Sequence, residues 1–534
     1  MAYKILVTDD LSPQAIHLLE AASDATFDNV HRPSQEELRE IIPNYDAVII
    51  RSSVKIDKTI IDNATNLKVI GRGGVGLDNV DINAASLRGI VVLNTPGANT
   101  IATAEHTMSM LLALCRNIPQ ADRSLRDHQW ARSQFLGVQL YRKTLGIVGL
   151  GRIGAQVARR AQSFSMNVIA FDPFINDEVA RELKVELVEF DELLSRADFI
   201  TLNAASTAET KNLINKKTIA RMKPGVRLVN CARGVLVDEA ALVEALQSGQ
   251  IAGAALDVFD KEPLTDNSPL RDLPNVVLTP HIAASTVEAQ EDVGTQVVDR
   301  VLAALRGDDF RSAVNMPVAD ASIFRELAPY LHLAEKLGNV QMQLAEGPVK
   351  RVEVEFQGDE VSDHVKPLTV ALLKGMLDPV TDTPVNYISA PHLAMQRGIS
   401  VTETKGLPDL NYANLLKCHV IWDGGERFIS GSLLGHESPR VVQIDSFKLD
   451  AQLEGIILVM ESQDLPGVVG QVATLLGKHT INIAEWRMGR SGPWEGSPTS
   501  INISFINLDI LASSEVLEEL KQLDRVLKVT QIKL

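Results

Sequence analysis

The 534-residue chain carries 52 Lys and Arg against 68 Asp and Glu, a formal net charge of -16 that disfavours nucleic acid as a partner. Apolar residues make up 45% of the chain, yet no run of roughly eighteen of them occurs, so no membrane span is expected. A chain of this length exceeds a single hydrophobic core, and three or four domains are expected.

The N-terminus enters a strand-like apolar run at once (MAYKILVTDD), without the three-part pattern of a signal peptide. Three cysteines are present, widely spaced and unmatched to any metal-binding pattern: Cys115, Cys231 and Cys418. This usage predicts a reducing, cytoplasmic environment, with neither a disulfide framework nor a metal site.

The first hundred residues alternate β-branched runs with helical patterns (YKILVTD, SPQAIHLLEAA, DAVIIRSS), which is typical of a parallel sheet covered by helices. A long helical pattern from Thr100, TIATAEHTMSMLLALCRNIPQ, leads to a second alternating series. After His281 a long amphipathic pattern is placed to return the chain to the first unit. We therefore expect a discontinuous, flavodoxin-like α/β lobe (residues 1–98 and 282–316) with a second α/β domain, residues 99–281, inserted in it.

Beyond the linker-like VNMPVAD the pattern becomes strand-rich, and residues 317–453 are expected to form an α+β intervening domain. Residues 454–534 alternate as strand, helix, strand, strand, helix, strand. This order predicts a ferredoxin-like fold.

The inserted domain opens with a glycine-rich turn, GLGRIG, between an apolar strand and a helix. Gly149, Gly151 and Gly154 have the spacing that lets backbone N–H groups and the helix dipole hold a pyrophosphate. The following strand ends at Asp172, placed to accept hydrogen bonds from a ribose. Because an acidic side chain there repels the extra phosphate of NADP, the motif predicts a Rossmann domain that binds NAD.

Three polar residues follow successive strands of the same domain: Arg233, Glu262 and His281. The carboxyl ends of strands form the ligand crevice of such sheets, so the three side chains are expected to converge beside the nicotinamide. Histidine can take a hydroxyl proton as hydride leaves, glutamate can stabilise the protonated imidazole, and arginine can bind a carboxylate. Singly, each could equally be a surface or strand-end residue.

The sequences around these residues are NCARGVLVDE, GAALDVFDKEP and LTPHIAAST, with GRGGVGLDNVD and NTPGANT in the first lobe. They resemble the NAD-dependent D-2-hydroxyacid dehydrogenases, most closely the long-form branch that acts on 3-phosphoglycerate. The resemblance implies that a dinucleotide domain interrupts a substrate lobe. It also implies that His281 is the acid/base, Glu262 its partner and Arg233 the group that orients the substrate.

By the same resemblance, further residues face the cofactor or the substrate. The expected cofactor contacts are Arg152, Ile153, Ala204, Cys231 and Asp257, besides the three glycines, Asp172 and His281; Ala204 lies in Asn203-Ala204-Ala205, where relatives usually have His-x-Pro. The expected substrate contacts are Arg51, Arg72, Asn99 and Arg132 together with Arg233. Some of these arginines could instead pair with surface acids.

The C-terminal region, with ESQDLPGVVGQV and HTINIAEWRMGR, resembles an ACT regulatory domain. The resemblance makes Asp464 and Asn482 candidates for binding an effector, commonly L-serine, although the domain could serve assembly alone. His392, Arg397, His436 and Arg440 of the intervening domain form either an anion site or a solvated surface. A homodimer or homotetramer is expected.

The resemblance implies NAD-dependent oxidation of 3-phospho-D-glycerate to 3-phosphohydroxypyruvate, the first step of serine biosynthesis. Two alternatives remain open. Another 2-hydroxyacid dehydrogenase, of the glycerate type, would keep the same three residues. An NADH-sensitive corepressor-like scaffold would share the core but would lack the ACT-like tail.

Overall fold

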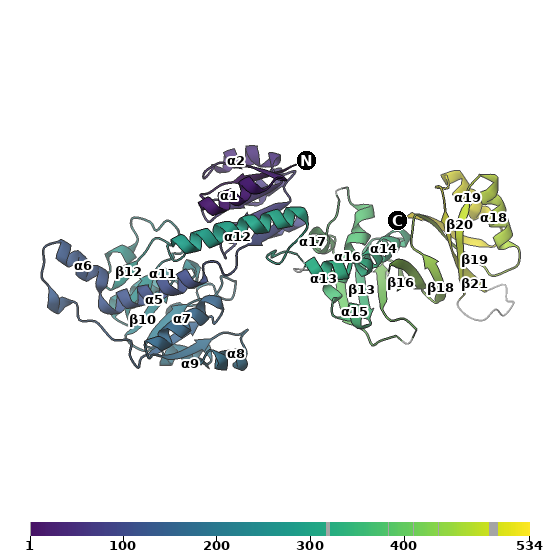
Figure 1. Ribbon diagram of the computed structural model, residues 1–534. Coiled ribbons are helices and arrows are strands. Elements are labelled where there is room, and N and C mark those ends of the chain that lie inside the picture. The colour runs from purple at the N-terminus through teal and green to yellow at the C-terminus, as the bar shows by residue number, and fades with distance from the viewer. Residues whose placement is uncertain (1, 317–320, 383, 410, 436, 491–499) are drawn as a thin grey trace.

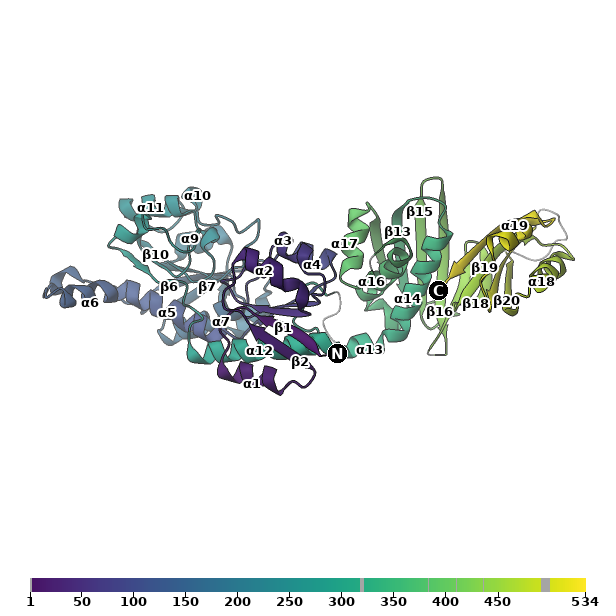
Figure 2. The same ribbon diagram turned by 90° about the horizontal axis from the view of Figure 1, so that it is seen from above.

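The computed structural model describes residues 2–316, 321–382, 384–409, 411–435, 437–490 and 500–534. The molecule is elongated, with two α/β lobes at one end and two further units following in line (Figure 1). Seen from above, the chain order of the last two units is also their order along the molecule (Figure 2). Among the described residues, no helix combines the length and the apolar character needed to cross a membrane.

The first lobe is built on a five-stranded parallel sheet in the order β2-β1-β3-β4-β5. Its strands are β1 (Tyr3–Val7), β2 (Ala25–Asn29), β3 (Ala47–Ile50), β4 (Val69–Arg72) and β5 (Val91–Asn94), and its helices are α1 (Pro13–Ala21), α2 (Gln35–Ile41), α3 (Lys58–Asn63) and α4 (Ile82–Leu87). The long helix α12 (Val287–Arg306) returns from the second lobe and packs on this sheet, burying Val297, Val298 and Val301 among its strands. The two lobes are thus joined by two crossings of the chain.

The second lobe contains a seven-stranded parallel sheet in the order β12-β11-β10-β9-β6-β7-β8. Its strands are β6 (Thr144–Val148), β7 (Asn167–Phe171), β8 (Glu186–Leu187), β9 (Phe199–Leu202), β10 (Val226–Asn230), β11 (Ile251–Leu256) and β12 (Val276–Leu278). Helices α5 (Thr100–Arg116) and α7 (Arg152–Ser163) share one apolar core with the sheet, and α9 (Phe190–Arg196) and α11 (Glu239–Ser248) share the other. The short helices are α8 (Asp177–Glu182) and α10 (Lys216–Ile219).

The prediction of one long helix from Thr100 is wrong in one respect, because Asn117 divides the segment into two helices. That residue adopts the left-handed conformation (φ 52°) and ends α5, and Pro119 lies in the first turn of the next helix, α6 (Ile118–Arg126). Proline is tolerated there because the first turn of a helix needs no N–H donor. Helix α6 buries none of its residues and protrudes at the far end of the molecule (Figure 2).

The third unit packs helices against one face of a mixed sheet, in which β13 and β14 pair parallel and the other strands antiparallel. It consists of α13 (Ala321–Glu326), α14 (Ala328–Leu344), β13 (Val349–Gln357), α15 (Asp359–Ser362), α16 (Val365–Leu377), α17 (Ser389–Gln396), β14 (Ser400–Lys405), β15 (Leu415–Trp422), β16 (Gly425–Leu434), β17 (Ser438–Ile444) and β18 (Phe447–Gln452). It meets the first lobe where Asn386 Nδ2 donates to the Gly89 carbonyl at 2.8 Å and Ile388 enters that lobe's core.

The last unit runs β19 (Ile456–Gln463), α18 (Val468–Lys478), β20 (Ile483–Arg490), β21 (Ile501–Leu508), α19 (Ser514–Gln522) and β22 (Val526–Lys533). The predicted alternation of strands and helices is therefore present, and the strands pair antiparallel in the order β20-β21-β19-β22. Pairing of Lys448 with Arg490 continues the sheet of the third unit into this one.

The crossing of α14 and α16 yields a testable consequence. A Cβ on Gly338 of α14 would lie 2.0 Å from the Leu372 carbonyl oxygen, whereas a Cβ on Gly470 of α18 meets nothing within 4 Å. Gly-to-Ala favours an exposed helix interior by up to about 1 kcal/mol. We expect Gly338→Ala to lower the thermal midpoint of the full-length chain, because the helices must separate.

Gly470→Ala is the matched control and should leave that midpoint unchanged or raise it. Equal midpoints for the two variants in calorimetry would contradict the close helix crossing.

Candidate active site

The glycine-rich turn lies at the carboxyl end of β6, where α7 begins. Gly149 has φ 93°, and a Cβ there would lie 2.8 Å from the Ala204 backbone nitrogen. A Cβ on Gly154 would lie 2.2 Å from the Gly149 carbonyl oxygen. These two glycines therefore let the turn close against its neighbours.

Gly151 is different, because it is exposed and a Cβ there would meet nothing within 4 Å. It caps α7 with no side-chain hydrogen bond, so the first N–H groups of that helix face open space. Asp172, just after β7, accepts the Leu150 N–H at 2.8 Å and the Phe174 N–H at 2.9 Å. An open helix N-terminus beside a fixed carboxylate suits a pyrophosphate and an adjoining ribose, so these residues fit NAD.

His281 and Glu262 form a close pair at the carboxyl edge of the same sheet. His281 Nδ1 lies 2.6 Å from Glu262 Oε2, and Glu262 Oε1 accepts the Phe259 N–H at 3.1 Å. Burial raises the pKa of Glu262, but the hydrogen bonds from His281 and Phe259 outweigh it and hold the pKa below the usual value. The carboxylate is thus ionised at neutral pH, and the imidazole keeps Nε2 for a substrate.

Asp257, at the end of β11, holds the loop that carries His281. The residue has no exposed surface, and its Oδ1 accepts from the Thr279 hydroxyl at 2.6 Å and the Ile282 N–H at 2.9 Å. Its Oδ2 accepts the Ala283 N–H, also at 2.9 Å, and its backbone carbonyl accepts the His281 N–H. The buried carboxylate fixes this loop, including the left-handed conformation of His281 (φ 54°).

Three arginines from the two lobes gather where the lobes meet. Arg233 bridges them, since its Nε donates to Asp78 Oδ2 of the first lobe at 3.0 Å. Burial, together with the nearby guanidiniums of Arg233 and Arg51, lowers the pKa of Arg72 to about 10, which still leaves it charged at pH 7. Among the described residues neither Arg51 nor Arg72 has an ion-pair partner, although Arg51 donates to the Gln290 side chain. Two of these three guanidiniums thus have no carboxylate partner within the described part of the chain.

Two other predicted substrate residues differ in burial: the side-chain oxygen of Asn99 is buried, whereas Arg132 is exposed. Asn99 precedes α5 at the junction of the lobes, and its Oδ1 is buried without a hydrogen-bond partner, as is Arg72 Nε. Arg132 is exposed, follows the protruding α6, and forms no ion pair with any described residue of its own chain. The first arrangement suits a ligand at the junction, whereas the second keeps Arg132 apart from the other predicted cations.

The four remaining predicted cofactor residues differ in exposure. Cys231 follows β10, and burial beside Asp257 raises its thiol pKa to about 12. Ile153 and Ala204 are partly buried next to the glycine turn, and Arg152 is exposed at the start of α7. A thiol with so high a pKa has no nucleophilic role at pH 7.

The two predicted effector residues are not brought together within one chain. Asp464 is nearly buried at the end of β19 and pairs with Arg490 at 2.7 Å. Asn482 donates to Asp509 at the other end of the sheet, where Ile456 of β19 pairs with Leu508. The length of an eight-residue strand, about 25 Å, separates the two positions.

The predicted anion site of the third unit is also dispersed. His436 lies outside the described residues. His392 lies in α17, and Arg397, the residue that ends this helix, donates to the Val380 carbonyl. Arg440 belongs to β17 and lies 3.7 Å from Glu485. Arg397 and Arg440 thus have separate protein partners.

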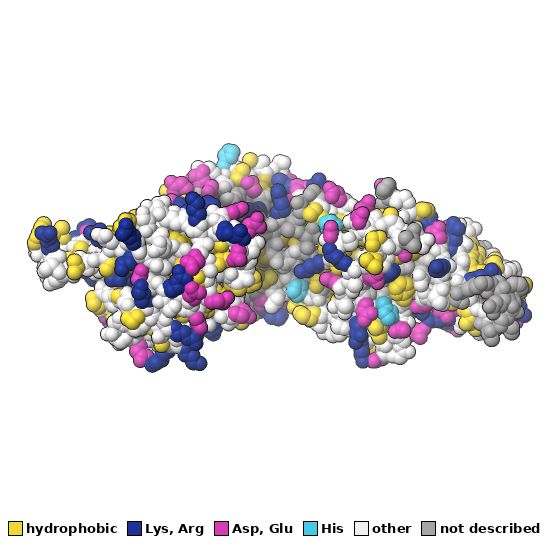
Figure 3. Space-filling view, turned by 90° about the horizontal axis from the view of Figure 1, so that it is seen from below, with side chains coloured by type: hydrophobic (Ala, Val, Ile, Leu, Met, Phe, Trp, Pro, Cys, Tyr) yellow, Lys and Arg dark blue, Asp and Glu magenta, His cyan; other side chains and the backbone are white. Residues whose placement is uncertain are grey.

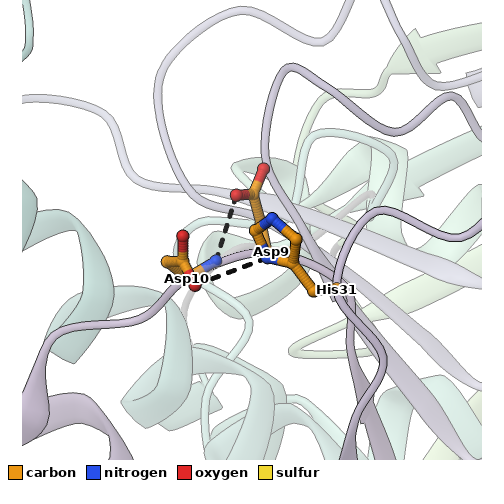
Figure 4. Close-up of side chains that lie close together, drawn as sticks. All are labelled: Asp9, Asp10 and His31. Carbon is orange, nitrogen blue, oxygen red and sulfur yellow. Dashed lines mark hydrogen bonds and ion pairs between the residues drawn. The ribbon is translucent and has the colours of Figure 1, made fainter.

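A small carboxylate and imidazole cluster lies at the carboxyl ends of β1 and β2 (Figure 4). Asp10 Oδ1 is 3.4 Å from His31 Nδ1, and Asp9 is engaged by Ser53 and Arg32. No ion is needed to account for these contacts.

Sequence reasoning missed three residues that support the site: Asp78, His106 and Thr279. Asp78 pairs with Arg233 across the lobes, and His106 Nε2 lies 3.2 Å from the Thr279 hydroxyl and 3.2 Å from Asp257 Oδ1. A signal existed only for His106, whose helical spacing places it with the buried Thr103 and Met110.

The sequence of this chain is similar to those of known dehydrogenases. Residues 108–283 match the family model described as D-isomer specific 2-hydroxyacid dehydrogenase, NAD binding domain, and residues 326–445 match the D-3-phosphoglycerate dehydrogenase intervening domain. D-3-phosphoglycerate dehydrogenase from Archaeoglobus fulgidus is 42% identical over 531 residues, covering 99% of this chain and 100% of the relative. The chain belongs to the D-3-phosphoglycerate dehydrogenase family. The resemblance and the NAD prediction are confirmed.

Other members and solved structures agree with this placement. The D-3-phosphoglycerate dehydrogenase of Bacillus subtilis is 39% identical over 532 residues, covering 100% of both chains. The TT0316 protein from Thermus thermophilus superimposes with a TM-score of 0.54 at 38% identity, covering 58% of this chain and 99% of that one. D-lactate dehydrogenase from Aquifex aeolicus, complexed with NAD and lactic acid, gives 0.52 at 29% identity, covering 57% and 96%. The chain is an NAD-dependent oxidoreductase with this family's α/β fold.

The lowered pKa of Glu262 leads to a prediction about pH. Because the pKa of Glu262 lies below its usual value, the carboxylate is ionised throughout the neutral and alkaline range. Replacing it with the isosteric Glu262→Gln removes the charge that stabilises protonated His281. We expect kcat/KM to fall by about 10²-fold at neutral pH and to stay depressed at alkaline pH.

The measurement is the initial rate of NADH formation between pH 6 and 9 on both proteins. Convergence of the two profiles toward pH 9 would contradict a charge that acts throughout this range.

Proposed function

We propose that the protein oxidises 3-phospho-D-glycerate to 3-phosphohydroxypyruvate with NAD, the first step of serine biosynthesis. One observation carries the proposal: a cluster of guanidiniums that lacks enough carboxylate partners lies between the lobes, and its member Arg233 precedes Gly234, which packs against Phe259, the residue whose N–H Glu262 accepts. A phosphorylated carboxylate supplies the negative charge that these guanidiniums lack. The names of relatives that match over the whole chain support the same substrate.

The residues of the chain would act as follows. Arg233 and the first-lobe arginines Arg51 and Arg72 bind the charged ends of the substrate, so that its C2 hydroxyl lies against His281 Nε2. His281 takes the hydroxyl proton as the C2–O bond becomes a carbonyl, and Glu262 stabilises the resulting imidazolium. When bound, NAD accepts the hydride that leaves C2.

The domain assignments belong to the same proposal. The strand order β2-β1-β3-β4-β5 supports a flavodoxin-like substrate lobe of residues 1–98 and 282–316 around the NAD domain, residues 99–281. The βαββαβ order of residues 454–534 supports a ferredoxin-like ACT domain after an intervening domain of residues 317–453.

The surface supports a homo-oligomer. Helix α6 and the segment after it expose apolar side chains: Ile118, Leu125, Trp130 and Leu136, the last two 85% and 91% exposed. Hydrophobic and basic side chains lie together on this protruding end (Figure 3). Because isolated arms of this kind expose more apolar surface than a monomer usually does, a second copy of the chain is the partner we propose.

Such an assembly bears on two other predicted residues. Arg132 lies in this exposed segment, so in an assembly formed through the segment it would lie beside the partner chain. An amino-acid effector such as L-serine can touch both Asp464 and Asn482 only between two chains, since one chain holds them at opposite ends of its sheet.

The catalytic proposal predicts a clean separation of binding from turnover. With 3-phospho-D-glycerate as substrate, His281→Ala should lower kcat by about 10²-fold or more, because the hydroxyl proton has no acceptor. Its affinity for NADH, followed by fluorescence, should stay near that of the wild type, since the glycine turn is untouched. His17→Ala, on the exposed side of α1, is the control. Turnover retained in His281→Ala would remove that residue from the reaction.

The oligomer proposal predicts that one charge in the exposed segment dissociates the assembly. Leu136→Asp should shift the sedimentation coefficient toward that of a monomer, because the carboxylate would be buried in the interface. Leu407→Asp is a matched control, since Leu407 is similarly exposed (85%) but lies in the third unit. The same species for both variants would place the interface elsewhere.

A further inference from the structure

Helix α5 contributes a histidine, His106, that contacts the start of the 279–283 loop, which carries His281. The other inward positions of this helix are apolar, threonine or cysteine, but His106 is only 17% exposed and faces the carboxyl edge of the sheet. Its Nε2 lies 3.2 Å from both the Thr279 hydroxyl oxygen and Asp257 Oδ1. A nonpolar side chain would satisfy packing here, so the polar contact calls for a separate explanation.

The donors around Asp257 define what His106 does. The Thr279 hydroxyl donates to Asp257 Oδ1 at 2.6 Å, so the Thr279 oxygen is left to accept a hydrogen bond. The arrangement is satisfied when the imidazole carries its proton on Nε2, which then donates to the Thr279 oxygen and the Asp257 carboxylate together. Without that donor, the Thr279 oxygen and the Asp257 carboxylate each lose a hydrogen bond, and the nearby Met110 Sδ, 3.7 Å from the hydroxyl oxygen, has no hydrogen to donate in its place.

The contact reaches the reacting groups through the loop. Asp257 binds the N–H groups of Ile282 and Ala283 on one side of His281, and Thr279 lies on the other. Burial by itself raises the pKa of Asp257, yet its hydrogen bonds, that of His106 foremost, hold the pKa below the usual value. An ionised carboxylate is the form that accepts from all these donors.

We propose that His106 is a positioning residue for hydride transfer: its Nε2–H orients the Thr279 hydroxyl and the Asp257 carboxylate, which fix the 279–283 loop so that His281 meets both Glu262 and the substrate. His106 itself touches neither substrate nor cofactor. The inference rests on the proposed function for its kinetic consequence, while the fixing of the loop stands on the contacts alone.

The test compares two replacements of His106 that differ in one hydrogen-bond donor. His106→Leu fills the space without a donor, whereas His106→Gln places an amide N–H close to the position of Nε2. Because small displacements of a catalytic group are costly, we expect His106→Leu to lower kcat by about tenfold or more. KM for NAD should change by no more than about twofold, and His106→Gln should recover most of kcat.

A double-mutant cycle of His106 with Thr279 distinguishes a positioning role of His106 from a role in packing alone. Thr279→Val removes the middle of the chain of hydrogen bonds, and His106→Leu with Thr279→Val should cost no more than the larger single effect. Ser109→Ala, on the exposed face of α5, controls for changes to the helix itself. Equal kcat for His106→Gln and His106→Leu, or additive losses in the double variant, would overturn the proposal.

A readout without turnover keeps this test apart from that of the substrate. Hydrogen exchange of the amides of residues 281–283, followed by mass spectrometry, should be at least about tenfold faster in His106→Leu and Thr279→Val than in the wild type. It should be near wild-type in His106→Gln. A wild type that ignores 3-phospho-D-glycerate but shows this pattern would refute the substrate alone; unchanged exchange in His106→Leu would refute the positioning role whatever the substrate.

Discussion

Positive charge left without ion-pair partners where the two lobes meet is the constraint around which the catalytic half of this molecule is organised. In a chain of net charge -16, Arg72 lies partly buried near Arg51 and Arg233, and the pKa of Arg72 falls to about 10 as a result. The repulsion between these like charges costs free energy, and a bound anion offsets this cost by its attraction to them. Since Arg233 comes from one lobe and the other two arginines from the other, an anion bound among them also draws the lobes together.

The inserted arrangement of the domains makes this possible. The chain crosses between the lobes twice, before α5 and before α12, and Arg233, which follows β10, meets Asp78 of the first lobe at 3.0 Å. Asp257 connects the second crossing to the chemistry, because the loop whose amides it binds leads from β12 past His281 into α12. The contact of Asn386 and Ile388 with the first lobe then fixes the third unit beside the α4–β5 turn.

Much of this was predictable because parallel sheets place successive strand ends side by side. Arg233, Glu262 and His281 are predicted from their positions after three strands, and β10, β11 and β12 are indeed neighbours. The sequence did not reveal Asp78 or the role of His106, whose partners lie more than a hundred residues away. It also overextended α5 past Asn117, where a left-handed residue starts a new helix. Antiparallel pairing separates Asp464 from Asn482 in a way that motif reading alone could not foresee.

The most direct measurement of the central claim is the ratio of kcat/KM for 3-phospho-D-glycerate to that for unphosphorylated D-glycerate, at low and at high salt. Each charge-assisted contact of the phosphate with these arginines contributes about 1.5–3 kcal/mol, so the account predicts a preference of at least about tenfold for the phosphorylated acid. Added salt should reduce that preference by screening the cleft. Equal kcat/KM for the two acids, unaffected by salt, would show that the unpaired positive charge does not select the substrate.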